Sequence, residues 1–124
     1  MIDWRKLCTG AQDVQIDGDV VVVTLGRGRQ HRVDVESKSE AVELRAVVAR
    51  RAVVDEQDNP ALAAWYRNRA GSLVGFRLDD RGRLVGESWV PGAGLTADEF
   101  LVYLRGIAAA CDLFEFQLTG KDKE

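Results

Sequence analysis

The segment from Thr96 to Gly120 constrains the fold more than any other, because it predicts one long amphipathic helix with both ends marked. Thr96-Ala97-Asp98-Glu99 is a capping box, in which the Thr hydroxyl accepts a first-turn backbone N–H and the Glu carboxylate accepts the N–H of the cap residue itself. Gly120 ends the helix. The helix is about 33 Å long and can cross a whole β-sheet. Its apolar residues recur every three or four positions and form one stripe, made of Phe100, Leu104, Ile107, Cys111, Phe114 and Leu118.

The first third of the chain predicts antiparallel strands for that helix to cover. After a short helix over residues 3–8, Asp17-Gly18 separates two β-prone runs and indicates a two-residue hairpin turn. Residues 30–36 then alternate, with His31, Val33 and Val35 on one side. We therefore expect at least three strands before residue 37.

Residues 39–54 fit either a strand or a helix. A helix capped by Ser39 would place Arg51 in its apolar stripe and would contain five valines, which favour sheets. The strand interpretation is preferred, because the apolar residues Val42, Leu44, Ala46 and Val48 alternate.

A helix over residues 61–69 is predicted after the polar loop 55–59. Pro60 suits the first turn of a helix, and Asn59 precedes it as a cap. We expect this helix to bury its large apolar residues, which are Leu62, Trp65 and Tyr66.

Residues 72–90 predict a second hairpin, in which Asp79 pairs with Arg83 and Gly82 is left-handed. This register sets Phe76 opposite Gly86, where a large ring covers a residue without a side chain. The face expected to meet the long helix carries Val74, Phe76, Leu78, Leu84, Gly86 and Ser88.

The opposite face of this hairpin is half apolar and half charged. Either the shorter helix covers it, or it is held for a partner protein or a second copy of the chain. The candidate binding residues are Leu73, Arg77, Val85 and Trp89.

Together these elements predict an α+β fold: a twisted antiparallel sheet of five to six strands, packed by the long C-terminal helix and a shorter middle helix. We expect a single domain over residues 1–124. No apolar run approaches the roughly 20 residues of a membrane helix. Residues 1–7 lack the apolar core of a secretory signal, so we expect a cytoplasmic protein with reduced thiols at Cys8 and Cys111.

No arrangement of residues predicts catalysis, a metal or a cofactor. His31 is the only histidine and is expected to be exposed, and no C-x-x-C pair is present. Gly86-Glu87-Ser88-Trp89-Val90 nearly matches a nucleophile elbow, but it ends in Val and is predicted to lie within a strand. An enzyme or small-molecule-binding domain with unusual residues would need a deep polar pocket around His31 or Ser88.

A nucleic-acid-binding protein is the other alternative. Arg27, Arg29, His31 and Arg32 gather at a predicted hairpin tip, but no aromatic residue lies between them for base stacking. The net charge of -3 also opposes phosphate binding. A solvated hairpin tip is therefore the preferred interpretation.

The order of elements resembles the YbjN-type domain, whose fold is that of the class I type III secretion chaperones. The residues that carry the resemblance are Asn68 in Trp65-Tyr66-Arg67-Asn68, the hairpin over 75–85, Pro91, the capping segment 95–100 and Ala110-Cys111-Asp112. The resemblance implies a homodimer without catalytic residues or cofactor, and relatives that bind an extended stretch of a partner protein or serve in regulation. The chain departs from the family in its N-terminal helix, which is limited to residues 3–8.

Overall fold

The computed structural model describes residues 2–70 and 73–120, and it forms a six-stranded antiparallel sheet with helices packed against it. The strands lie in the order β1-β2-β3-β4-β6-β5. This architecture confirms the predicted α+β class. The elements are α1 (Trp4–Leu7), β1 (Val14–Asp17), β2 (Val20–Thr24), the 3-10 turn η1 (Gly26–Gly28), β3 (Gln30–Ser37), β4 (Ala41–Ala49), α2 (Arg51–Val54), α3 (Pro60–Ala70), β5 (Gly75–Leu78), β6 (Leu84–Pro91) and α4 (Ala97–Thr119).

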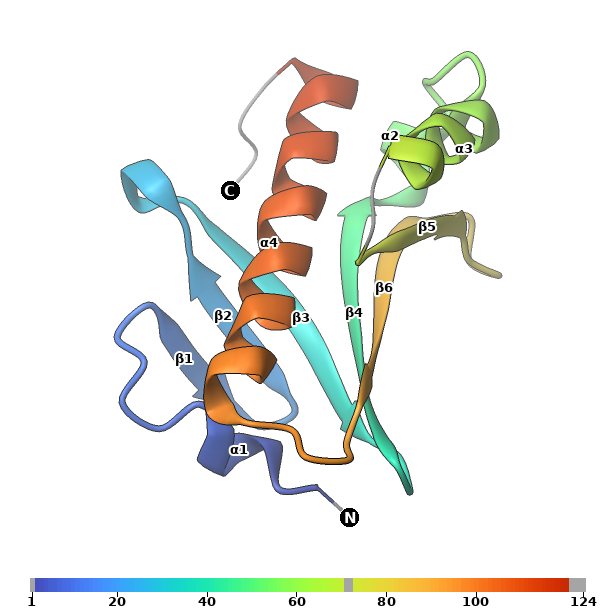
Figure 1. Cartoon of the computed structure of the whole chain (residues 1–124). Coiled ribbons are helices and arrows are strands. Elements are labelled where there is room, and N and C mark those ends of the chain that lie inside the picture. The colour runs from blue at the N-terminus through green and yellow to red at the C-terminus, as the bar shows by residue number, and fades with distance from the viewer. Residues whose placement is uncertain (1, 71–72, 121–124) are drawn as a thin grey trace.

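The helix α4 crosses one face of the sheet, as its length and stripe predict (Figure 1). Its capping box is present: the Glu99 N–H donates to Thr96 Oγ1 at 3.2 Å, and the Thr96 N–H donates to Glu99 Oε1 at 3.4 Å. Gly120 follows in the left-handed conformation. The stripe is buried against the sheet from Phe100 to Phe114, so it forms the core and is not available as a coiled-coil seam.

The strand interpretation of residues 39–54 is confirmed for Ala41–Ala49, which forms the central strand β4 between β3 and β6. The last four residues of the segment differ, because they form the single helical turn α2. The backbone N–H groups of Val53 and Val54 both donate to the Arg50 carbonyl there. The apolar residues that alternate in β4 point toward α4 and are buried.

The hairpin β5–β6 has the predicted register. Phe76 pairs with Gly86, the Asp79 N–H donates to the Arg83 carbonyl at 2.8 Å, and Gly82 has a φ of 76°. The Phe76 ring packs edge-on against Phe114 of α4, with ring centres 5.0 Å apart. Leu78 is the exception on this face, because it lies at the end of β5 and is 37% exposed.

The helix α3 begins as predicted, since the Leu62 N–H donates to Asn59 Oδ1. The prediction that it buries Leu62, Trp65 and Tyr66 is wrong: they are 44%, 49% and 60% exposed. The helix packs through the small residue Ala64 instead, and it lies against the edge strand β5 rather than over a face of the sheet.

The side chain of Asn68 fixes this position of α3 at the edge of the sheet. Its amide nitrogen donates to the Phe76 carbonyl at 3.0 Å, and its amide oxygen accepts the Phe76 N–H at 2.7 Å. Both outward backbone groups of Phe76 are therefore occupied, as they would be by a neighbouring strand.

The strands β3 and β4 pair at one end only and diverge toward α2 (Figure 1). Their register runs from Ser37 opposite Val42 to Asp34 opposite Arg45. Beyond it, the His31 ring crosses the gap, and its Nε2–H donates to the Val47 carbonyl at 2.9 Å. His31 is only 3% exposed, so the prediction of an exposed histidine is wrong. It shares the inward side of β3 with Val33 and Val35, and that side is covered.

Candidate protein-binding surface

The face of the sheet turned away from α4, here called the open face, carries the exposed side of the β5–β6 hairpin. On β6, Gly86 and Ser88 point toward α4. Because side chains alternate along a strand, Glu87 and Trp89 point to the open face. Among the described residues, Trp89 pairs only with Glu43 of β4, because β5 does not extend to it, and its side chain is 59% exposed. The shorter helix α3 does not cover it, because that helix lies against the edge strand β5.

Leu73 lies beside β6, because Ser88 of that strand is hydrogen-bonded to its backbone. The Ser88 hydroxyl donates to the Leu73 carbonyl at 2.7 Å, and Leu73 itself is 43% exposed. This bond gives the buried Ser88 hydroxyl a structural role. A cavity of about 330 Å³ adjoins the indole and is lined by Glu43, Gly75, Phe76, Arg77, Glu87, Ser88 and Trp89.

The charges on the open face are paired across three strands. Arg45 Nη2 of β4 lies 3.3 Å from Glu43 and 3.4 Å from Glu87, and Arg77 of β5 forms a further ion pair with Glu87. The hydrogen bond that Arg77 donates to the Glu87 carboxylate raises the pKa of Arg77. Two arginines and two glutamates thus form a balanced network beside Trp89, and partly exposed charges of both signs remain for a partner.

Val85 occupies a different position from the other three predicted residues. It is fully buried, although it belongs to the same side of β6 as Trp89. Its cross-strand neighbours are Val47 on β4 and Arg77 on β5. Val85 is therefore part of the buried interior, whereas Leu73, Arg77 and Trp89 lie at the surface.

A second apolar stripe runs along the outer side of α4 and was not predicted. Its large members Val102, Leu113 and Phe116 are 58%, 49% and 47% exposed, and the small residues Gly106 and Ala109 lie between them. Their spacing of four, three, four and three residues was visible in the sequence. The stripe toward the sheet has the same period, and spacing alone does not indicate which one is covered.

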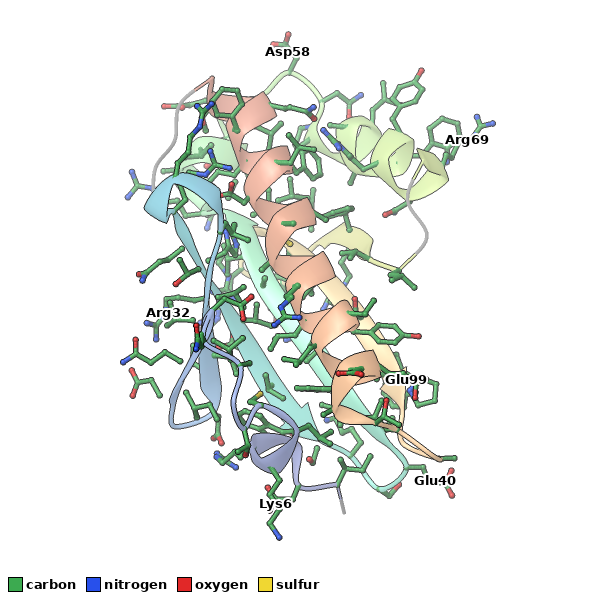
Figure 2. The ribbon with its side chains drawn as sticks, turned by 60° about the vertical axis from the view of Figure 1, so that its left-hand side comes forward. Lys6, Arg32, Glu40, Asp58, Arg69 and Glu99 are labelled. Carbon is green, nitrogen blue, oxygen red and sulfur yellow. The ribbon has the colours of Figure 1, made fainter. Side chains whose placement is uncertain are left out.

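The basic hairpin tip does not form one surface. Arg29 reaches α4, where its Nη2 lies 2.8 Å from Asp112 Oδ2, and His31 is buried. Arg27 adopts a φ of 66° at the exposed tip, while Arg32 projects from β3 into solvent (Figure 2). The four residues thus point in different directions, and the structure gives no support to a nucleic-acid interface here.

Comparison with known families places the chain. The family named YbjN, described as "putative bacterial sensory transduction regulator", matches residues 5–119. The chain belongs to the YbjN family. This membership confirms the resemblance drawn from residues 65–112. No curated protein matches the YbjN-family chain described here. Among the described residues, none of its helices is both long enough and apolar enough to cross a bilayer.

Solved structures share the fold of this YbjN-family chain at low sequence identity. YbjN from E. coli aligns with a TM-score of 0.65 and 13% identity, over 94% of this chain and 89% of that chain. The ExsC–ExsE complex aligns with a TM-score of 0.57 and 18% identity, over 88% and 84%. The type III secretion chaperone SycH of Yersinia pestis, in complex with a stable fragment of YscM2, aligns with a TM-score of 0.49 and 9% identity. This alignment covers 82% of this chain and 87% of that chain.

Proposed function

We propose that this YbjN-family protein is a non-enzymatic module that binds a segment of a partner protein on its open face, in a regulatory or chaperone role. The observation that carries the proposal is the exposed indole of Trp89 beside a cavity of about 330 Å³. Tryptophan is one of the three side chains, with tyrosine and arginine, that are enriched among the residues contributing most to binding energy at protein interfaces. A chain that shares the fold was solved as part of the ExsC–ExsE complex.

The structure also favours one mode of binding. A partner strand that added to β5 would need the outward N–H and C=O of Phe76, and Asn68 already bonds both. The partner segment is therefore expected to lie across the open face. There an apolar side chain of the partner segment enters the cavity beside Trp89. Charged residues next to it in the partner segment pair with the network of Arg45, Arg77 and Glu87.

The test uses two exposed tryptophans as a matched pair. The wild-type protein is used to capture partners from its native lysate, and the Trp89→Glu variant is expected to lose them. Trp65 of α3 is also an exposed indole, at 49%, and the Trp65→Glu variant is expected to capture the same partners as the wild type. Each partner so identified is then purified, and its affinity is measured by calorimetry. We expect at least a tenfold loss for Trp89→Glu. Equal affinity of both variants for every partner would refute the proposal, provided that both unfold like the wild type.

We also propose a homodimer formed through the outer stripe of α4. In an antiparallel pair centred near Ala109, Leu113 of one copy lies opposite Gly106 of the other, and Val102 lies opposite Phe116. A large residue then faces a glycine at which an added Cβ would meet no atom within 4 Å. Light scattering is expected to give twice 13.7 kDa for the wild type and for the control Leu62→Glu, and 13.7 kDa for Leu113→Glu. A monomeric wild type would contradict the dimer. It would not bear on partner binding, which the comparison of Trp89→Glu with Trp65→Glu tests separately.

A further inference from the structure

Three side chains of the kinds that bind metals meet where β3 and β4 diverge beneath α4. His31 comes from β3, and Asp112 and Glu115 come from successive turns of one side of α4. One ligand atom of each lies within 4.8 Å of the others. His31 and Asp112 are buried and Glu115 is half-buried, so the cluster is not an ordinary exposed group of acids.

The imidazole of His31 is held in the orientation of a metal ligand. A carbonyl oxygen only accepts, so the contact at 2.9 Å with Val47 fixes the proton on Nε2. Nδ1 then points at Asp112 Oδ1, 3.9 Å away, and it has no hydrogen-bond partner although the side chain is only 4% exposed. Metal-bound histidines typically donate their other ring N–H in this way.

The carboxylate of Asp112 is also anchored from outside the cluster. Arg29 Nη2 lies 2.8 Å from its Oδ2, which leaves Oδ1 directed toward His31. Arg29 therefore takes the part of an outer residue that orients a ligand.

The site has room and access for an ion. A cavity of about 530 Å³ is lined by His31 and Glu115 together with residues of β3, β4 and α2, so water can reach the cluster and complete a coordination shell. Bonds of about 2.0–2.2 Å to a divalent ion place neighbouring donor atoms roughly 3–4 Å apart. His31 and Asp112 already meet this spacing, and a carboxylate oxygen of Glu115 lies within 4.8 Å of both ligand atoms.

We propose that His31 Nδ1, Asp112 and Glu115 bind one divalent transition-metal ion, with water in its remaining positions. One imidazole nitrogen and two carboxylates suit Zn²⁺ and its spectroscopic substitute Co²⁺ better than Mg²⁺ or Ca²⁺, which prefer oxygen ligands alone. Such an ion would link α4 to β3. This inference does not depend on the open face being a protein-binding surface.

The experiment titrates tag-free, metal-stripped protein with CoCl₂, followed by visible absorption, and with ZnCl₂, followed by calorimetry. We expect one ion per chain. Glu115→Gln and Asp112→Asn should each weaken binding about 10–100-fold. Asp34→Asn is the matched control, because Asp34 lines the same cavity outside the cluster, and it should bind like the wild type.

Metal binding by His31 is measured on the wild-type protein, so the result does not depend on whether a variant folds. In the wild type, NMR of the His31 ring should show a shift on Zn²⁺ addition and none on Mg²⁺ addition. Absence of saturable Co²⁺ binding would overturn the proposal, as would unchanged affinity in Glu115→Gln and Asp112→Asn, or an equal loss in Asp34→Asn. A His31 ring whose NMR signals do not respond to Zn²⁺ would likewise overturn the proposal.

Discussion

Gly86 offers the sharpest test of how α4 packs on the sheet. A Cβ added at this position would lie 2.6 Å from Cys111 Sγ and 3.1 Å from both Phe76 Cε1 and Val74 Cγ1. Ordinary contacts begin near 3.4 Å, and Cys111 is fully buried, so its sulfur has no solvent into which to rotate. Gly86→Ala therefore requires α4 or β6 to move. Overpacking of this kind costs about 1–3 kcal/mol of unfolding free energy, or roughly 3–15 °C in Tm.

A second substitution should relieve the cost. Cys111→Ala removes the atom nearest to the new Cβ, at an expense of about 1 kcal/mol for the lost buried sulfur. If the sulfur causes the clash, the double variant loses less than the sum of the two single losses, by about 1 kcal/mol or more. Gly75→Ala is the matched control on the same hairpin, where an added Cβ meets no atom within 4 Å. It should be neutral or slightly stabilising.

Urea unfolding followed by tryptophan fluorescence measures all four variants, because Trp4 is buried and reports on the core. The reasoning is refuted if Gly86→Ala is as stable as the wild type. It is also refuted if the two losses add within about 0.5 kcal/mol, since the clash would then not involve Cys111.

Four further predictions test local features of the fold. Asn68→Ala removes both bonds to the edge strand β5 and should cost about 1–2 kcal/mol in urea unfolding, with unchanged stability contradicting it. Thr96→Ala should cost about 1 kcal/mol by the same assay, whereas Thr96→Ser should retain the cap. Burial acts to raise the pKa of Asp79, but hydrogen bonds from the Arg83 backbone and side chain and from a neighbouring N–H outweigh it and lower the pKa. Its stabilisation is therefore present above the unfolded pKa near 4 and is lost as pH falls through the folded pKa, so Asp79→Asn should flatten the acid limb of a stability–pH profile. Burial raises the pKa of Cys111 to about 12, so native protein at pH 8 should not react with iodoacetamide at this thiol, as peptide mass spectrometry can show.

Features of the fold that depend on neighbouring residues could be predicted from the sequence. The capping box of Thr96 and Glu99 and the turn from Asp79 to Arg83 need only a few consecutive residues. The pairing of Phe76 with Gly86 followed from that turn, because the length of a hairpin loop sets the register of its strands.

Features that depend on which side of an element is covered could not be predicted. Alternation places Val85 and Trp89 on one side of β6, yet Val85 is buried and Trp89 is exposed. The large residues of α3 point outward because Ala64 and Asn68 make its contact with β5. A period shows which residues share a side and says nothing of the neighbour that meets it.

The cluster around His31 lay furthest from prediction. Its members are separated by about 80 positions in the chain, and they meet only because α4 crosses the gap between β3 and β4. Neither His31 in a valine-rich strand nor a D-x-x-E spacing in a helix is distinctive by itself. The signal that was available is the position of His31 on the same side as Val33 and Val35, which predicts burial.

The divergence of β3 from β4 has a consequence for how the protein unfolds. Four residue pairs and the bond from His31 to Val47 join the half-sheet β1–β2–β3 to the half-sheet β4–β6–β5. The helix α4 packs on strands of both halves, so it couples them into one cooperative unit. Amide hydrogen exchange should therefore show the two half-sheets opening together while α4 is docked, and separately once its stripe is weakened. The long helix is therefore the element that makes the two half-sheets unfold as one unit.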